Sequence, residues 1–144
     1  MREHLLSIAT VALLFTGCAI SPEERLAEHN IIVEDSGIMR DFKIVSVVSK
    51  DRDDGLKEAQ AVLKNDTSKN RKISYKVDWV DKDGFVQDSL LSKWKTVNVE
   101  AGRNAIISGI SPSIDTSDFK IRINYPSKDD EKRIDSAHYE YQGH

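Results

Sequence analysis

The sequence contains a single cysteine, Cys18, and only three prolines and seven glycines. One cysteine cannot form a disulfide within the chain, so packing alone must stabilise the fold. The four histidines are His4, His29, His138 and His144, and no two of them have the spacing of a zinc-binding pair on a helix. With a net charge of −3, the chain also lacks the basic surface that nucleic-acid binding requires. We therefore expect no cofactor, no metal and no nucleic-acid partner.

Long apolar runs are also scarce, because no internal stretch approaches the ~20 apolar residues of a membrane span. The exception is Leu5–Phe15, which follows Arg2 at the N-terminus and has the length of a signal-peptide core. It leads into Thr16-Gly17-Cys18, small residues before a cysteine, which resembles a bacterial lipobox. In a lipobox the small residues fit the signal peptidase and the thiol takes a diacylglyceryl group. Phe15 stands where leucine is usual, and a core helix with a buried cysteine is the alternative interpretation.

This resemblance predicts a cleaved signal peptide at residues 1–17 and a lipidated Cys18. Several acyl chains, at ~0.8 kcal/mol per buried methylene, would anchor the protein stably in a bilayer. Ala19 follows where aspartate would retain the protein in the inner membrane, so we expect the periplasmic side of the outer membrane. Residues 18–29 are interpreted as a tether. Ser21 to Glu24 have the pattern of a capping box, but a helix there is too short to be stable alone. As a coil the tether reaches roughly 18 Å.

The stretch Arg71–Gly84 is the clearest strand of the predicted domain, which covers residues 30–126. Its odd positions from Ile73 to Trp79 are apolar or aromatic, and the even positions between them are polar. This period of two is typical of a half-buried strand, whose polar side faces solvent. Asp81-Lys-Asp-Gly84 then supplies the residues of a tight turn.

Other strand-like runs recur at intervals of about ten residues, which favours an all-β, immunoglobulin-like antiparallel β-sandwich. Residues 56–63 are ambiguous, because strong helix formers lie between two strand-like runs. Asp35-Ser36-Gly37 is interpreted as the end of the strand candidate Ile31–Val33. The tail, residues 127–144, is nearly all polar or charged, and we expect it to be mobile. The strand-like runs are Ile31–Val33, Phe42–Val48, Ala105–Ile110 and Asp118–Tyr125.

No constellation of residues indicates catalysis, and we expect the protein not to be an enzyme. Asp78, Asp81 and Asp83 do not complete a calcium-loop pattern, which would need ligands at Trp79 and Leu90. Asp51, Asp53 and Asp54 fail the same template and are interpreted as a solvated hairpin end. Ser117-x-x-Lys120 matches the Ser-x-x-Lys motif of penicillin-binding enzymes. Here it lies at the start of a predicted strand, and the partner motifs of those enzymes are absent.

Aromatic and basic residues offer weaker alternatives. Tyr75, Trp79, Trp94 and Phe119 could line a ligand pocket, although aromatic side chains at strand spacing are more often core. The basic residues Lys72, Lys76, Lys120 and Arg122 could form a patch if their strands are neighbours. A solvated sheet face is the plainer interpretation of these charges.

The order of these features resembles the YcfL-like family of small bacterial lipoproteins over Ala59 to Tyr125. The resemblance implies an immunoglobulin-like sandwich and a strand at residues 56–64, and it carries over no catalytic residue. It extends over Gly109-Ile-Ser-Pro112 and Phe119-Lys-Ile-Arg-Ile. The motif residues, interpreted as structural, are Tyr75, Trp79, Asp81, Gly84, Trp94, Gly102 and Pro112.

We therefore expect an outer-membrane lipoprotein that acts as a non-catalytic binding or accessory module. Its partners would be the bilayer, through acylated Cys18, and a protein or polymer of the envelope, through a sheet face or edge. A small-ligand carrier that uses the aromatic residues, and an envelope hydrolase with an unrecognised site, are the alternatives.

Overall fold

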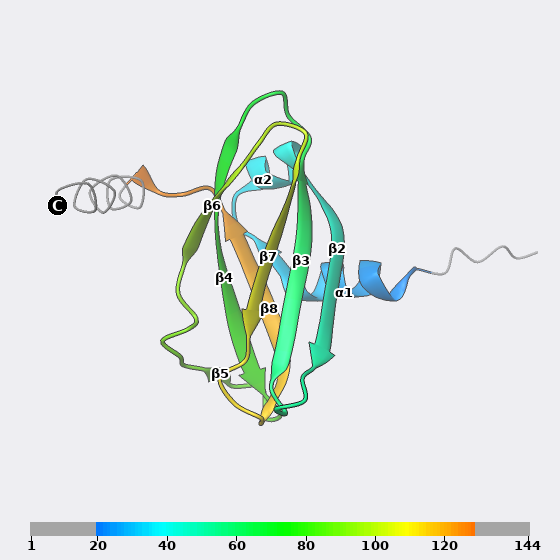
Figure 1. The fold of residues 1–144 in the computed structure, drawn as a ribbon, viewed down its shortest axis with the longest axis vertical. Coiled ribbons are helices and arrows are strands. Elements are labelled where there is room, and N and C mark those ends of the chain that lie inside the picture. Colours follow the sequence, from blue (N-terminus) through cyan, green and yellow to red (C-terminus); the bar gives the residue numbers. More distant parts are fainter. Residues whose placement is uncertain (1–19, 129–144) are drawn as a thin grey trace, which may run out of the picture.

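The computed structural model describes residues 20–128 (Figure 1). Cys18, the predicted signal peptide and nearly all of the predicted tail therefore lie outside the described residues. No helix within 20–128 is long and apolar enough to cross a membrane. The elements in chain order are α1 (Pro22–Asn30), β1 (Ile31–Val33), α2 (Ser36–Asp41), β2 (Phe42–Asp51), β3 (Lys57–Asn65), β4 (Arg71–Asp81), β5 (Val86–Gln87), β6 (Lys95–Val99), β7 (Asn104–Ile110) and β8 (Thr116–Asn124).

Two sheets pack face to face, which confirms the all-β sandwich. A five-stranded sheet has the order β1-β8-β4, and β5 and β6 both pair with β4 on its other side. A three-stranded sheet has the order β2-β3-β7 (Figure 1). The pairs are antiparallel except β1 with β8, which run parallel with Ile31 opposite Ile121. The expected purely antiparallel sandwich therefore has one parallel pair at its edge.

The core lies between the sheets and contains the inward side chains that the period of two predicts. Trp79 is 1% exposed, and its ring centroid lies 6.0 Å from that of Phe119 on β8. Burying a large apolar side chain contributes on the order of 1.5–3 kcal/mol, so this pair is a major part of the core. Strand β3 faces it with small and branched residues, namely Ala59, Ala61 and Leu63.

Residues 57–65 are a strand. The family resemblance implies this strand, whereas local propensity alone does not decide between strand and helix. Ala59, Ala61, Leu63 and Asn65 are buried and alternate with half-buried residues. Strand β3 is the central strand of its sheet and pairs with β2 on one side and β7 on the other. The interstrand hydrogen bonds and the buried row outweigh helix propensity, which amounts to at most a few tenths of a kcal/mol per residue here.

The flexible tether predicted for residues 18–29 is wrong over its described part, because the chain is helical from Pro22. Ser21 caps the helix: its hydroxyl accepts from the Glu24 amide at 3.2 Å, and the Glu24 carboxylate accepts from the Ser21 amide at 2.9 Å. Nine residues are too few for a stable isolated helix. Leu26 and Ala27 pack against the core, and this docking supplies the missing stability.

Asp35-Ser36-Gly37, which follows the end of β1 as expected, forms the start of α2. Asp35 caps this helix by accepting a hydrogen bond from the Gly37 amide at 2.8 Å, and Ile38 is fully buried. Asp and Ser begin turns and helices alike, so local sequence does not separate the two. The helix is stabilised by the burial of Ile38, whose side chain packs in the core.

Candidate functional site

The motif residues of β4 divide between the core and a tight turn. Trp79 is buried, and Tyr75 is half-buried and packs against the core. The Asp81 carboxylate accepts from the amides of Asp83 at 2.9 Å and Phe85 at 3.0 Å, and Gly84 has φ of 89°. Asp81 and Gly84 are therefore turn residues, and their effect is to place Phe85 at the end of the sandwich.

Trp94 is not a core residue, contrary to expectation. Its side chain is 47% exposed and lies in the connection between β5 and β6, just before β6 begins. The period of two that buries Trp79 does not continue here, because residues 88–94 are not part of a strand.

This connection is longer than the sheet requires. Gln87 pairs with Trp79 and Lys95 pairs with Tyr75, so only residues 76–78 of β4 separate the two pairs. Three residues in an antiparallel strand would span that gap. The chain instead uses Asp88–Trp94, an excursion that leaves the sandwich on the side away from α1 (Figure 1).

The excursion and the turn before it expose an unusual set of apolar side chains. We call this set the apolar edge; it comprises Phe85 (72% exposed), Val86 (64%), Leu90 (84%), Leu91 (66%) and Trp94 (47%). These five residues lie within ten positions of one another in the chain, and exposed apolar side chains grouped in one part of a monomer often mark an interaction site. The apolar edge is therefore the candidate binding site.

Hydrogen bonds hold the strand and the tip of the apolar edge in place. The Ser89 hydroxyl accepts from the Leu91 amide at 3.0 Å, and the Ser89 carbonyl accepts from the Ser92 amide at 3.1 Å. Strand β5 is fixed by a short hydrogen bond between the side chains of Gln87 and Thr116 on β8. The Leu90–Leu91 tip is thus a defined turn that projects from a fixed strand.

Gly102 and Pro112 have structural positions. Gly102 has φ of 69°, a conformation that favours glycine, and its amide donates to the Asn65 carbonyl at 2.9 Å. Pro112 is exposed in the loop that follows β7. Neither residue contributes to the apolar edge.

The outer face of the five-stranded sheet carries ion pairs and not the basic patch considered above. Arg122 Nε lies 2.6 Å from Asp78 Oδ2, and Lys76 Nζ lies 2.8 Å from Asp78 Oδ1. Burial raises the pKa of Asp78, but the hydrogen bonds from Lys76 and Arg122 outweigh it and hold that pKa below its ordinary value. Asp78 is only 6% exposed and Ser74 is 4% exposed, so the polar side of β4 is not fully solvated as expected.

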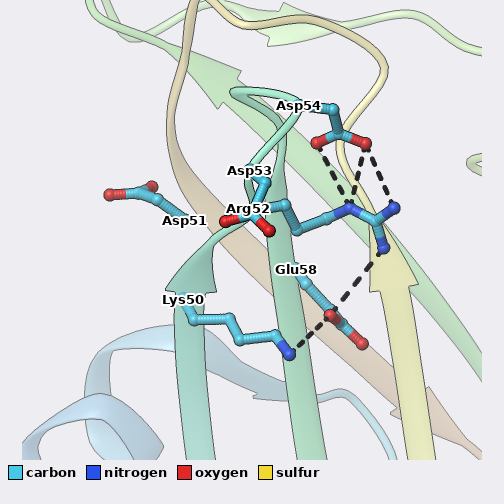
Figure 2. A pocket seen from close by; sticks show the side chains of 6 residues that line it. All are labelled: Lys50, Asp51, Arg52, Asp53, Asp54 and Glu58. Atoms are coloured by element: carbon cyan, nitrogen blue, oxygen red, sulfur yellow. Dashed lines mark hydrogen bonds and ion pairs between the residues drawn. The ribbon is translucent and has the colours of Figure 1, made fainter.

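A second candidate is an open hollow of about 490 Å³ at the end of the β2–β3 hairpin (Figure 2). Its charged side chains are largely paired with one another: Arg52 with Asp54 at 3.1 Å, and Lys50 with Glu58 at 3.2 Å. The Arg52 guanidinium lowers the pKa of Asp54, the opposite of what a general acid needs. The remaining lining residues are Asp51 and Asp53.

The other residues with chemical potential do not assemble into a site. His29, on α1, lies 3.3 Å from Asp118, and within residues 20–128 no group of three or more ligating side chains could hold a metal. Ser117 is the extra residue at a register shift in β8, and its hydroxyl donates to the Val80 carbonyl at 3.4 Å. Lys120 Nζ donates to the His29 carbonyl at 2.5 Å, so the two side chains have different partners. The Ser-x-x-Lys spelling is therefore not a catalytic pair.

Comparison with known proteins identifies the family. A family model described as a protein of unknown function, DUF1425, matches residues 29–125, which is most of the domain. The chain belongs to this family. No curated protein sequence matches the chain.

Solved structures support the same fold. The Campylobacter jejuni protein cj0090 is 23% identical with a TM-score of 0.58, and the match covers 67% of this chain and 98% of that one. A DUF1425 family member from Shewanella sp. pv-4 is 15% identical with a TM-score of 0.55, and that match covers 60% and 80% of the two chains. At these identities the likeness concerns the fold alone.

Sequence reasoning missed the apolar edge because it assigned Trp94 to the core and considered Leu90 only as a position of a failed calcium-loop pattern. The available signal was the Leu90-Leu91 pair between Asp88-Ser89 and Ser92-Lys93. Two adjacent leucines break a period of two, and the polar residues on both sides are typical of a loop. Together these features indicate exposed leucines on a loop.

Proposed function

We propose that this protein is a YcfL-like lipoprotein of the outer membrane that acts as a non-catalytic binding module in the periplasm. The lipobox at Cys18 supports the anchor, and Ala19 supports the outer membrane. The binding role rests chiefly on the apolar edge.

The occupant proposed for the apolar edge is an envelope protein. All five of its side chains are apolar, and two of them, Phe85 and Trp94, are aromatic. Aromatic residues are enriched at the centres of protein interfaces, whereas a glycan would need converging hydrogen-bonding groups. An apolar groove on a partner protein fits this edge better than a polysaccharide does.

The two alternatives have less support. A small-ligand carrier would need a cavity beside the aromatic core, but Trp79 and Phe119 pack against each other and Trp94 lies outside the core. A hydrolase would need a carboxyl group of raised pKa in a cleft. In the hollow of Figure 2, the pKa of Asp54 is lowered by Arg52.

Photo-crosslinking in intact cells tests the binding role. A photoactivatable residue at Leu90 should yield one discrete adduct with another protein. The matched control is Ile106, which is 65% exposed on β7 of the other sheet and should yield no such adduct. Equal labelling at both positions, or an adduct of two copies of this chain, would count against an accessory module that binds a different protein.

The anchor is tested by replacing Cys18 with alanine. The variant should lose lipid labelling and move from the membrane fraction to the soluble periplasm. Unchanged sedimentation with membranes would refute the lipoprotein assignment.

A further inference from the structure

Helix α1 is fastened to the sandwich at its C-terminal end. The Asn30 side chain is 1% exposed, and its amide donates to Asp118 Oδ1 at 2.9 Å and to the Phe119 carbonyl at 2.5 Å. Lys120 Nζ donates to the His29 carbonyl at 2.5 Å. Because these partners all belong to β8, the C-terminal end of the helix is fixed to the five-stranded sheet.

The N-terminal end of α1 is also ordered by its own contacts. The capping box closes on Ser21, and the Arg25 guanidinium donates to the Ile20 carbonyl at 3.2 Å. Only residues 19–21 therefore separate Cys18 from the helix. Three residues, even fully extended, span about 10 Å, which is much less than the reach of a twelve-residue coil of roughly 18 Å on average.

Such a short connection limits how the domain can sit relative to whatever holds Cys18. Helix α1 packs against β2, β8 and β1, and β6 lies at the opposite edge of the five-stranded sheet (Figure 1). From β1 to β6 there are three strand spacings, or about 14 Å at ~4.8 Å each. The width of the sheet thus exceeds the reach of the connection.

We infer that the α1 side of the sandwich faces the phospholipid surface and that β6 and the apolar edge face away from it. This inference rests on the proposed acylation of Cys18. A lipid-held Cys18 keeps Ser21 within about 10 Å of the headgroups, so the side opposite α1 is directed into the periplasm. The apolar edge is then presented to partners and not to lipid.

The charges on α1 indicate that the short connection to Cys18 orients the domain, and that binding of α1 to lipid does not. The exposed helix residues Glu24 and Glu28 are acidic and flank Arg25. A surface helix that binds membranes by itself presents a basic polar face and a large apolar face. The Cys18→Ala domain should therefore show no binding to vesicles of phosphatidylethanolamine and phosphatidylglycerol.

Fluorescence quenching of the lipidated protein in such vesicles tests the orientation. Cys18 is the only cysteine, so after lipidation an introduced cysteine is the single free thiol. Glu28→Cys on α1 and Asn98→Cys on β6, both exposed positions, each receive a fluorophore. A headgroup-attached nitroxide should quench the Glu28 label several-fold more strongly than the Asn98 label. Equal quenching at the two positions would overturn the inference.

An insertion separates the length of the connection from other causes. An insertion of about twelve Gly-Ser residues between Ala19 and Ile20 gives the connection the reach of a flexible coil. The labels at Glu28 and Asn98 should then be quenched to similar extents. Persistence of the difference would mean that a lipid-binding surface orients the domain, which overturns the role of the short connection. If Cys18 is not acylated, the protein will not float with vesicles at all. That result would refute the proposed anchor. Protein that floats with the vesicles but shows equal quenching of both labels would refute the orientation alone.

Discussion

Asn65 joins two loops at one end of the sandwich through a fully buried side-chain amide. Its Nδ2 donates to the carbonyls of Lys69 at 2.8 Å and Val99 at 3.0 Å, and its Oδ1 accepts from the Thr67 amide at 3.0 Å. Each of these loops would otherwise leave buried backbone groups without partners. One side chain therefore fixes the β3–β4 connection and the end of β6.

Replacing Asn65 with alanine should lower the free energy of unfolding by about 2–4 kcal/mol, because the buried bond to the Val99 carbonyl and the part-buried bond to the Lys69 carbonyl are lost at once. Urea denaturation measures the loss. The matched control is Asn98→Ala, at an exposed position on β6, which should change stability by less than about 0.5 kcal/mol. Equal effects of the two substitutions would show that the Asn65 bonds do not stabilise the loops.

Gly109, the glycine of β7, lies where the two sheets approach each other closely. A Cβ at this position would lie 3.0 Å from Val77 Cγ2 and 3.5 Å from Trp79 Cζ2. We predict that Gly109→Ala destabilises the domain by about 1–3 kcal/mol through overpacking. Denaturation should show no comparable loss for Ser108→Ala, whose side chain points to the other face. A neutral Gly109→Ala would mean that the sheets separate easily at this point.

Asp41 and Tyr125 form a pH-sensitive pair at the α2 end. The Tyr125 hydroxyl donates to Asp41 Oδ2 at 2.6 Å, and this bond, followed by the one from Arg40, lowers the pKa of Asp41 from its ordinary 3.8. Burial and the Asp41 bond raise the pKa of Tyr125 to about 12. A lowered carboxyl pKa contributes stability above the unfolded pKa, and this stability is lost as pH falls through the folded pKa.

Tyr125→Phe keeps the ring beside Phe42 and removes only the hydroxyl. The variant should be less stable than the wild type near neutral pH. The difference should narrow as pH falls from 3.8, the ordinary value, through the lower pKa that Asp41 has in the folded protein. Urea midpoints of both proteins across this range measure the difference. A difference that stays constant with pH would contradict the coupling.

At the scale of elements, α1 and β3 show what local sequence can and cannot decide. The capping residues of α1 can be recognised in Ser21-Pro22-Glu23-Glu24. The docking of α1 on the sandwich cannot be predicted locally, because Asn30 bonds to residues on β8 that are some ninety positions away. Strand β3 is the reverse case: its residues favour a helix and its two neighbouring strands make it a strand. Local chemistry predicts ends and turns, whereas long-range pairing decides ambiguous segments.

Removing the α1 cap should loosen this helix and little else. Ser21→Ala costs about 1 kcal/mol of helix stability, which corresponds to roughly fivefold faster amide exchange in residues 25–30. Hydrogen exchange in β4 and β8 should be unchanged. As a control, Ser49→Ala at an exposed position of β2 should leave α1 protected. Loosening of the whole sandwich by Ser21→Ala would show that α1 and the sheets unfold together.

For the whole molecule, the two edges of the five-stranded sheet have different characters. Beside β1 the edge is covered by α1, whereas at β4 the partner strand is split into β5 and β6 by the excursion Asp88–Trp94. The sandwich itself was predictable from the period of two in β4 and β8. The excursion was not, because the number of residues needed between β5 and β6 is known only once their register with β4 is known.

If the excursion serves binding and not folding, shortening it should separate the two roles. Replacing Asp88–Trp94 with three threonines would join β5 and β6 into one strand, because three residues span the gap opposite 76–78 of β4. We expect the variant to lose no more than about 2 kcal/mol of stability, since the removed leucines are mostly exposed. A photo-crosslinker at Val86 should nevertheless lose its protein adduct.

The matched control keeps the length of the excursion and changes only its chemistry. Leu90→Ser with Leu91→Ser should abolish the Val86 adduct as completely as the shortening does, because the apolar tip and not the loop itself would contact the partner. An adduct that survives both changes would place the partner elsewhere on the sandwich. Unfolding of the shortened variant would instead show that the excursion is part of the fold, and the argument that the sheet does not require it would fail.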